Sequence, residues 1–577
     1  MHVKPIGFKS HFALGTDNMP HEADSRFSIL FALFFAVLIW SLATVTSQVR
    51  FPIGNDAIGY MVDATNLLQG RGLTRVVNET GSPDLDFEPT RYQPPGFALA
   101  MAGLSALGIS VENAAFAIAR FSWALLPVAL LFALRPILPF AWAVAVVALV
   151  VFSPGIYLNG STINTDVPTL LLIVFATGLL IRGVGERPRV GLLISTGLLL
   201  GLAYALRNSV TAVFAGMLAA FVGAVLLKQM PVAAAARNCA WVLLGSAPFV
   251  GLLLLRNYLV FGEVQPYVLM VGTDATLLES FRVYLHGLLW DLTGSPTLAR
   301  TLAWDSKILA LTATPIAGLL AWGLFSHWRV SGLHARFAVL YGLLFSAAGA
   351  AMLVIAHTYH GLDFGFLLRH MMQYAWLLFA LMLVALLATG ERKAKLLAGL
   401  LVAVLLASRL WFIADDLRTE RAIQAAFSRS DNVVEAAHPF LENGRILTDQ
   451  IKQRLAEDET IPAAIRALPG NALVLSNQGP LLGYLSGRPV RMLPFSSETD
   501  LSDVTSRVSR LFRDMHSHRP VYIALVPDNR IVRSPDGAVW QAKIASRLPE
   551  QYQVIRKEAN ILVLHVSAPA PEAIGEK

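Results

Sequence analysis

Charged residues and cysteine are both scarce in this sequence. Lysine, arginine, aspartate and glutamate make up 15% of its 577 residues, and Cys239 is the single cysteine. About a quarter of the residues in a soluble domain are charged, so the composition excludes an ordinary soluble protein. One cysteine excludes an intrachain disulfide, and it does not distinguish an oxidising from a reducing compartment.

Long apolar runs take the place of the missing charge. Hydrophobic residues make up 55% of the chain, and the mean hydropathy is +0.56. Because about 20 helical residues span the hydrocarbon core of a bilayer, the runs predict a polytopic α-helical membrane protein with about eleven spans. The first run is long for a signal peptide and many spans follow, so we interpret it as an uncleaved anchor. The predicted spans lie near 27–47, 113–134, 138–153, 166–183, 190–206, 209–227, 238–255, 305–325, 337–356, 367–388 and 395–413.

The distribution of lysine and arginine predicts how the spans are oriented. The formal net charge is +7 and the pI about 9.5, which on a soluble protein would suggest nucleic-acid binding. Here we attribute the charge to membrane topology and expect no nucleic acid, because a cytoplasmic N-terminus places a positive residue in every short inside loop. The predicted domains are a cytoplasmic tail 1–26, a transmembrane module 27–413 with outer loops 48–112 and 257–304, and a soluble domain 414–577 outside the membrane.

The region after about residue 413 has the sequence texture of a soluble α/β domain. Short apolar segments at 471–477, 520–527 and 560–566 are typical of buried strands, and 501–517 is typical of an amphipathic helix. Alternation of strand and helix favours a small extracytoplasmic α/β domain. This region has no glycine-rich phosphate loop, no metal-ligand spacing and no nucleophile elbow, so its sequence assigns it no reaction.

Polar residues gather in the first outer loop, in GNDAIGYMVDATNLLQGRGL (54–73) and RYQPPGF (91–97). An acid, a tyrosine, the pattern A-x-N-L-L-x-G-x-G-L and a Pro-Pro-Gly-aromatic phrase resemble the GT-C glycosyltransferases. The nearest groups are the bacterial members similar to protein O-mannosyltransferases and the lipid A aminoarabinose transferase. The resemblance continues at 161–172, 201–209, 254–262 and 475–490, and so covers nearly the whole chain. The matching residues in the first loop are Asp56, Tyr60, Ala64, Asn66, Leu67, Leu68, Gly70, Gly72, Leu73, Pro94, Pro95 and Gly96.

This resemblance implies an integral-membrane enzyme that uses a polyprenyl-phosphate sugar. It would transfer a hexosyl or pentosyl group, with inversion, to a hydroxyl of an envelope lipid, glycan or protein at the outer face of a bacterial cytoplasmic membrane. Phosphate leaves readily, whereas an alcohol is a poor nucleophile until it loses its proton, so one carboxylate base is the main requirement. Asp56 is the candidate base, and a turn or helix-capping aspartate after Gly54-Asn55 is the alternative.

Arginines at the outer ends of spans are candidates for holding the donor phosphate. Fixed cations at a low-dielectric interface stabilise the charge that develops there, and the guanidinium fits phosphate oxygens. Arg369 with His370 comes first, followed by Arg256 and Arg207; headgroup contacts or structural ion pairs are the alternatives. Asp166 is expected to pair with one of these arginines or to bind the acceptor. The other candidate substrate-binding residues are Tyr60, Arg91, Tyr92 and Gln93.

The sequence leaves the need for a metal ion open. Many relatives carry an acidic pair after the first span, but here Ala57 follows Asp56. The segment HTYHGLD (357–363) has two histidines three residues apart, which is weak evidence for a site. The sequence therefore identifies no certain cofactor and no metal ligands, and a divalent metal stays an alternative. A second acid would have to come from Asp63, Asp84, Asp86 or Glu88.

Two other functions compete with sugar transfer. A transporter or flippase of a lipid-linked or anionic substrate is the main alternative, and a ligase that uses a lipid pyrophosphate donor is another. Transporters place ionisable residues near mid-membrane and often have repeated halves, whereas here the charges gather at outer span ends and no internal repeat is found. The pattern from Asp56 to Pro95 argues against the ligase.

Overall fold

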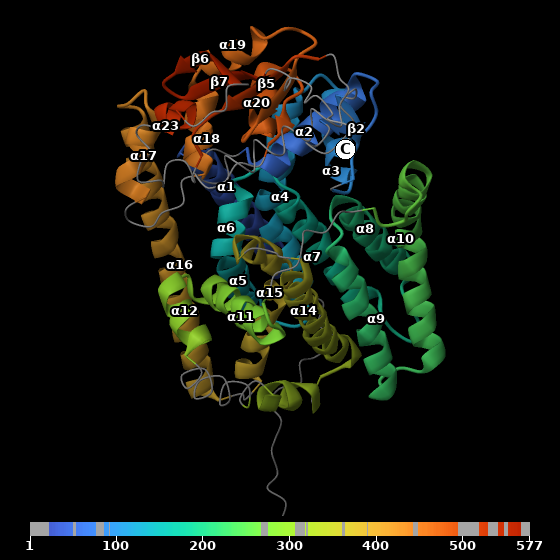
Figure 1. Cartoon of the computed structure of the whole chain (residues 1–577). Coiled ribbons are helices and arrows are strands. Elements are labelled where there is room, and N and C mark those ends of the chain that lie inside the picture. Colours follow the sequence, from blue (N-terminus) through green and yellow to red (C-terminus); the bar gives the residue numbers. More distant parts are fainter. Residues whose placement is uncertain are drawn as a thin grey trace, which may run out of the picture.

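The first outer loop and the C-terminal region lie at the same end of a bundle of long helices in a computed structural model of the chain (Figure 1). In Figure 1, α2 (Asn55–Leu68) and α3 (Gly96–Ser105) lie beside the C-terminal domain. The structure describes residues 22–49, 53–76, 86–91, 93–266, 275–305, 318, 321–329, 331–360, 364–388, 391–441, 448–493, 519–528, 540–546 and 552–566.

Each predicted span except 305–325 corresponds to a helix, and most of 305–325 lies outside the described residues. Within the described part of the chain, six helices are long and apolar enough to cross a membrane, or seven if one bent pair counts as a span. The predicted number of about eleven is therefore not confirmed. The helices are α1 (Glu22–Val49), α4 (Val111–Leu134), α5 (Phe140–Val151), α6 (Pro154–Gly160), α7 (Asp166–Gly183), α8 (Val190–Leu206), α9 (Val210–Leu226), α10 (Val232–Phe261), α14 (Leu333–His360), α15 (Phe364–Leu387) and α16 (Arg392–Phe427).

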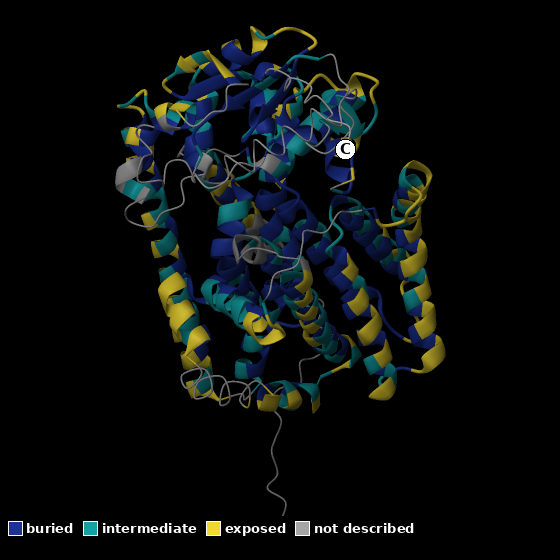
Figure 2. Cartoon of the chain, viewed as in Figure 1, coloured by how far each residue is buried: buried dark blue, intermediate teal, exposed yellow. Residues whose placement is uncertain are grey.

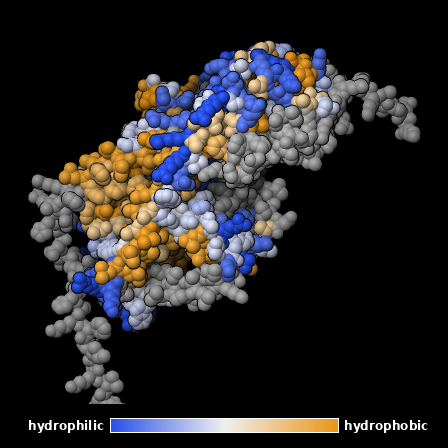
Figure 3. Space-filling model, turned by 90° about the vertical axis from the view of Figure 1, so that its left-hand side faces the viewer, coloured by the Kyte–Doolittle hydropathy of each residue, from blue (hydrophilic) through white to orange (hydrophobic). Residues whose placement is uncertain are grey.

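The outer surface of this bundle is apolar. Along α10 and α16, large hydrophobic side chains such as Leu252, Leu259 and Trp411 are exposed, and Figure 2 shows exposed residues along both helices. Figure 3 shows hydrophobic side chains gathered over the middle of one face, with hydrophilic ones toward the end that carries the C-terminal domain. Apolar surface of this extent is stable in lipid rather than in water, which supports a multi-pass membrane protein.

The predicted span 138–153 is a pair of helices bent by 59°. Pro154 lies in the first turn of α6, where its missing N–H costs little, and the bend falls at Ser153. Asp291 Oδ1 accepts a hydrogen bond of 2.8 Å from the backbone N–H of Gly155, so a neighbouring element satisfies the exposed start of α6. That element is α11 (Leu277–Thr293), which the sequence did not predict and which is followed by α12 (Pro296–Trp304).

The glycines of the first outer loop turn the chain out of α2. Gly70 and Gly72 have φ values of +78° and +76°, a left-handed conformation that favours glycine. Asn66 Nδ2 donates to the carbonyl of Thr74 at 2.9 Å, which fastens the end of α2 to the strand that follows. The pattern A-x-N-L-L-x-G-x-G-L therefore builds a turn that leads from α2 into an antiparallel pair, β1 (Thr74–Val76) and β2 (Phe87–Pro89).

A five-stranded sheet forms the centre of the C-terminal domain. Its strand order is β4-β3-β5-β7-β6; β3 pairs in parallel with β4 and β5, and β7 pairs antiparallel with β5 and β6. The three predicted strands are confirmed as β3, β5 and β7, while the predicted helix 501–517 lies outside the described residues. The strands are β3 (Leu473–Ser476), β4 (Arg491–Met492), β5 (Val521–Leu525), β6 (Tyr552–Glu558) and β7 (Ile561–Val566), with α17 (Val433–Leu441), α18 (Thr448–Glu457), α19 (Thr460–Arg466), α20 (Gly479–Ser486) and α23 (Trp540–Ser546) around them.

The hydrophobic core of this domain continues into the first outer loop. One cluster of buried side chains joins Ile58 and Met61 of α2 and Phe97 of α3 with Leu475 and Leu481 of the domain. A separate cluster fills the helix bundle. The C-terminal domain thus packs against α2, the helix that carries Asp56, on the side that faces away from the helix bundle.

Candidate active site

Asp56 lies in the first turn of α2, two residues after the Gly54 that caps this helix. A carboxylate in the first turn of a helix is favoured by the partial positive charge of the helix N-terminus. Its side chain nevertheless points to another partner, because Asp56 Oδ2 pairs with Arg369 Nη2 of α15 at 2.7 Å. The alternative of a helix-capping aspartate is not favoured, since Gly54 is the cap residue.

The segment STINTD (161–166) forms the turn that places Asp166. Asn164 Oδ1 accepts a 2.9 Å hydrogen bond from the backbone N–H of Asp166, and Asn164 Nδ2 donates to the carbonyl of Asn159 at 3.0 Å. These bonds hold the start of α7 against the end of α6. Asp166 is fully buried as a result, and its carboxylate faces the ends of α8 and α15.

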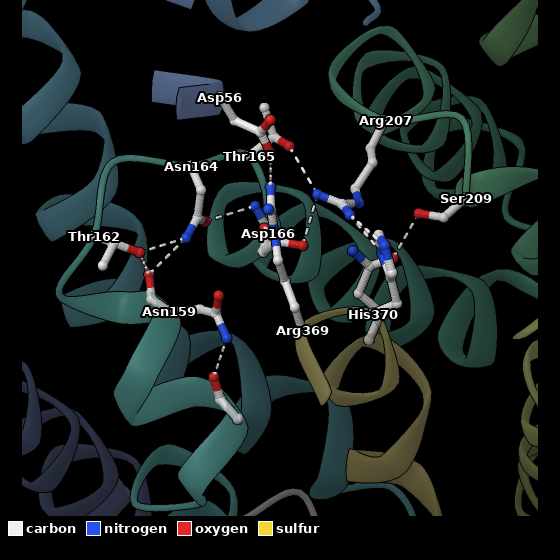
Figure 4. A network of polar contacts seen from close by, with 12 residues as sticks. Asp56, Asn159, Thr162, Asn164, Thr165, Asp166, Arg207, Ser209, Arg369 and His370 are labelled. Atoms are coloured by element: carbon white, nitrogen blue, oxygen red, sulfur yellow. Dashed lines mark hydrogen bonds and ion pairs between the residues drawn. The ribbon is translucent and has the colours of Figure 1, made fainter. Parts of the chain in front are cut away.

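Two arginines hold the Asp166 carboxylate from different sides (Figure 4). Arg207 Nη1 pairs with Asp166 Oδ1 at 2.6 Å, and Arg369 Nε pairs with Asp166 Oδ2. Arg207 also donates to Thr165 Oγ1 at 3.1 Å and contacts the ring of His370. The sequence predicted that Asp166 pairs with one of these arginines or binds the acceptor, and in the structure it pairs with two of them. The structure joins Asp56, Asp166, Arg207, Arg369 and His370 in one network.

The two carboxylates that share Arg369 differ in accessibility. The Asp56 side chain is 36% exposed, whereas the Asp166 side chain is 0% exposed. Burial acts to raise the pKa of Asp56, but Arg369, Arg207 and Arg75 together outweigh this effect, so the pKa lies below its usual value. Asp56 is therefore an ionised carboxylate that a ligand can reach.

Tyr60 follows Asp56 by one turn of α2 and is buried, with its ring edge-on to Phe97 at a centroid distance of 5.2 Å. Burial, and then the nearby Asp56 carboxylate, raise the pKa of Tyr60 to about 12. Tyr60 therefore keeps its hydroxyl proton. Its packing holds α2 against α3, which gives it a structural role in addition to the substrate contact that the sequence predicted.

A second polar cluster lies two turns further along α2. Arg75 donates to both oxygens of the buried Asp63 and, at 2.7 Å, to Gln93 Oε1, while Thr90 Oγ1 donates to Asp63 at 2.6 Å. Gly59 leaves the room for this arginine, because a Cβ there would lie 2.9 Å from Arg75 Cζ. Asp63 is thus the other acid of α2, and both of its carboxylate oxygens already accept hydrogen bonds from Arg75 or Thr90.

Arg256 and Arg91 lie beyond this cluster, against the same aromatic ring. Each guanidinium carbon is 5.0 Å from the centroid of Phe261, near the end of α10. Arg256 also donates to the carbonyl of Thr90 at 3.3 Å. The two arginines that the sequence ranked together are therefore separated: Arg207 belongs to the Asp56 network and Arg256 to the neighbouring cluster. Tyr92 lies outside the described residues.

No protein-family model matches the chain, and a comparison with curated protein sequences finds no match. The crystal structure of ArnT from Cupriavidus metallidurans bound to undecaprenyl phosphate matches 95% of this chain and 100% of its own, with 12% identity and a TM-score of 0.51. The archaeal oligosaccharyltransferase AglB from Archaeoglobus fulgidus, in complex with an inhibitory peptide and a dolichol-phosphate, matches 94% of this chain and 74% of its own, with 12% identity and a TM-score of 0.52.

The chain has the GT-C fold. Its likeness to these membrane glycosyltransferases confirms the predicted resemblance and extends over the spans, the first outer loop and the C-terminal domain together. The identity to both structures is only 12%, and the resemblance found in the sequence rests on short phrases such as A-x-N-L-L-x-G-x-G-L, which ends at Leu73.

Within this GT-C fold, the donor set around Asp56 favours an arginine over a metal ion as the group between the carboxylates. The Arg369 guanidinium contacts both Asp56 and Asp166. Across the described ranges, no group of three or more histidine, cysteine, aspartate or glutamate side chains is placed to hold a metal. In the segment 357–363, His357 Nδ1 and Ser280 Oγ are 2.9 Å apart, and Asp363 lies outside the description.

Several site residues have no signal in the sequence. Arg75, Thr90 and Thr165 were not predicted, because no spacing rule connects them with the groups that they contact. Each belongs to a segment of ordinary composition, and only the fold brings it to α2 or α8. Asp86 and Glu88, two of the candidate acids, lie outside the Asp56 network: Asp86 pairs with Arg519 of the C-terminal domain at 2.9 Å, and Glu88 belongs to β2.

Proposed function

We propose that this protein transfers a sugar from a polyprenyl-phosphate donor to an acceptor hydroxyl, with Asp56 as the general base. The observation that carries the proposal is the accessible Asp56 carboxylate, held by Arg369, which is itself held by the buried Asp166. The GT-C neighbours bound to undecaprenyl phosphate and dolichol-phosphate support a lipid-linked donor.

The proposed reaction is a single displacement. The acceptor oxygen attacks the anomeric carbon as its proton passes to Asp56, the bond from that carbon to the phosphate oxygen breaks, and polyprenyl phosphate leaves with the electron pair. One displacement inverts the anomeric centre, in contrast to retaining enzymes in which a second carboxylate becomes the nucleophile. The fully buried Asp166 is held by two arginines and is not placed to act as such a nucleophile.

Arg369 and Arg207 are the proposed phosphate-binding cations. The leaving phosphate gains negative charge, which fixed guanidinium groups stabilise in a site with little water. A phosphate near Arg369 competes with Asp56 for the same guanidinium. Donor binding therefore makes Asp56 a stronger base at the moment when it has to accept a proton. Arg256, Arg91 and Gln93 are more distant candidates, for contacts with the sugar or the acceptor.

The proposed location is the outer face of a bacterial cytoplasmic membrane. Helix α2, whose first turn holds Asp56, lies at the end of the bundle that carries the C-terminal domain (Figure 1). At the other end of the bundle, a turn that contains Lys228 joins α9 to α10. Helices α14 and α16 begin near Arg336 and Arg392. Positive charge at that end supports a cytoplasmic N-terminus and an extracytoplasmic domain. The acceptor hydroxyl belongs to an envelope lipid, glycan or protein, and the sugar is a hexose or pentose.

Replacement of Asp56 tests the base assignment. We expect Asp56→Asn to lower the transfer rate by about 10²–10⁴-fold, the usual contribution of a positioned base, with donor affinity maintained. The measurement is transfer from a polyprenyl-phosphate sugar by the purified protein in lipid nanodiscs. Asp86→Asn, which changes a half-exposed carboxylate of the same outer loop, is the matched control and should retain the wild-type rate. Wild-type transfer by Asp56→Asn would show that the base lies elsewhere.

Lipid analysis of a deletion strain separates sugar transfer from transport. If the proposal holds, one envelope glycan lacks a sugar and the lipid-linked donor of that sugar accumulates, both resolved by mass. Unchanged glycans and donors, under conditions in which the gene is expressed, would exclude the transferase and favour a transporter.

A further inference from the structure

Gln373 is a buried polar side chain next to the arginine network. It lies on α15 one helical turn after Arg369, so both residues are on one face of the helix. Gln373 is 0% exposed, and its Oε1 accepts a 2.8 Å hydrogen bond from Ser209 Oγ. Counted over the residues that the structure describes, Gln373 Nε2 has no hydrogen-bond partner. A buried donor without a partner is costly, which makes it a candidate for contact with a ligand.

A second donor without a partner belongs to the adjoining arginine network. Arg207 Nε is buried and, among described atoms, has no hydrogen-bond partner, although the rest of this guanidinium contacts Asp166, Thr165 and His370. Ser209 is the cap residue of the 17-residue helix α9, and its side chain makes no capping bond because it donates to Gln373. The N-terminus of α9 thus adds a partial positive charge beside the two unpaired donors.

The charges of the network cancel before any ligand binds. Arg207 and Arg369 contribute two positive charges, and Asp56 and Asp166 contribute two negative charges. A phosphate group therefore enters a site without net charge. The phosphate oxygens therefore need hydrogen-bond donors that the two carboxylates do not already use. A neutral amide can supply such a donor, and because it carries no charge it does not attract a further carboxylate.

We propose that Gln373 is a phosphate-binding residue: its amide donates to a non-bridging phosphate oxygen of the lipid-linked substrate, beside Arg207 Nε and the start of α9. This inference rests on the proposed function and deepens it, because it identifies which part of the network holds the phosphate of the donor and of the polyprenyl-phosphate product. In this arrangement Gln373 adds a neutral donor to the guanidinium groups of Arg207 and Arg369 at the phosphate, and Arg369 also holds Asp56.

The test compares binding of a short-chain polyprenyl phosphate and of the matching polyprenol to the full-length protein in nanodiscs. Gln373→Met keeps the side-chain length and removes the donor. We expect it to weaken binding of polyprenyl phosphate by about 10- to 100-fold, as for a hydrogen bond to a charged group, and to leave polyprenol binding unchanged. Gln424→Met, the same change on an exposed glutamine of α16, should bind both lipids as the wild type does.

The remaining outcomes separate the possible failures. Equal affinity of wild type and Gln373→Met for polyprenyl phosphate overturns the inference and leaves the proposed function standing. An equal loss of affinity for polyprenol, together with a lower melting temperature, shows a structural role for Gln373 and also overturns the inference. Wild-type protein that binds neither lipid overturns the proposed function and the inference together. Inorganic phosphate is then used as a competitor. It should displace polyprenyl phosphate if the protein recognises the phosphate headgroup, and it should have no effect if the protein recognises only the lipid chain.

Discussion

At the scale of single residues, Asp56 and Asp166 show how one arginine can support two different carboxylate roles. Arg369 contacts both, but only Asp56 is accessible, and only Asp166 has a second arginine. A carboxylate that is buried and held from two sides is a fixed anchor, because removal of either partner leaves a charge without compensation. Asp56 has one close cation and an open side, which suits a group that exchanges a proton with a ligand.

The lowered pKa of Asp56 predicts a pH dependence that Arg369 controls. Asp56 must be ionised to act as a base, so the rate falls as the pH drops through its pKa, which in the wild type lies below the usual value of about 4. Removal of the arginine charge in Arg369→Gln raises this pKa, because burial is then opposed less. The acidic limb of the plot of kcat/KM against pH should therefore shift to higher pH. The shift is measured on the residual activity of the variant.

Arg369→Lys is the control for this prediction. It keeps the positive charge near Asp56, so its acidic limb should stay close to that of the wild type. An acidic limb in Arg369→Gln at the wild-type position would contradict the assignment of that limb to Asp56.

At the scale of secondary-structure elements, the start of α3 is pressed against the end of α8. A Cβ on Gly96 would lie 2.5 Å from the carbonyl oxygen of Ala205, two residues before Arg207. The phrase Pro94-Pro95-Gly96 thus has a physical reason in this chain. The prolines fix the backbone before the helix, and the glycine permits the close approach.

Gly96→Ala should therefore disturb the site from a distance. Forcing a methyl group against backbone costs about 1–3 kcal/mol, so we expect a lower melting temperature and, because α8 leads directly into Arg207, a lower kcat/KM. Gly103→Ala lies on the same helix and has nothing within 4 Å of the added Cβ, so it should be neutral or slightly stabilising. Equal effects of the two substitutions would refute the close-packing explanation.

At the scale of the whole molecule, the C-terminal domain is a support for the catalytic helix. Its core is continuous with that of α2 and α3. Polar contacts reinforce the junction: Tyr484 donates to Glu112 at 2.8 Å, and Arg519 pairs with Asp86 at 2.9 Å. Half-exposed ion pairs contribute little, about 0–1 kcal/mol, so the shared apolar core is the main part of this attachment.

Loosening the C-terminal domain should reduce sugar transfer without any change in the Asp56 network. Leu481 of α20 is fully buried in the shared core, and Leu481→Ala should cost about 2–5 kcal/mol of stability. We expect a lower melting temperature and a reduced transfer rate, measured at a temperature where the variant is still folded. Val554→Ala, on the half-exposed strand β6 of the same domain, is the control and should affect neither. Normal transfer by a destabilised Leu481→Ala would show that the domain has a separate task.

The sequence by itself determined the membrane class, the position of most helices and three strands of the C-terminal sheet. It also singled out, as candidates, four charged residues that the structure joins: Asp56, Asp166, Arg207 and Arg369. These features depend on local patterns: apolar length, alternation, and charges that stand out because they are rare in apolar surroundings. The span count stayed uncertain, because an apolar run of 16 to 18 residues such as α8 satisfies the composition of a span without fixing its length or its bend.

Tertiary structure alone decided which of those charges meet. Arg369 and Asp56 are separated by most of the chain, and no local pattern distinguishes the arginine that joins Asp166 from the one that stacks on Phe261. Gln373 carried no signal at all, since one glutamine in a helix is unremarkable until its neighbours leave its amide without a partner. The physical reason is that pairing depends on the free energy of burial and desolvation, which side chains acquire only when distant segments pack together.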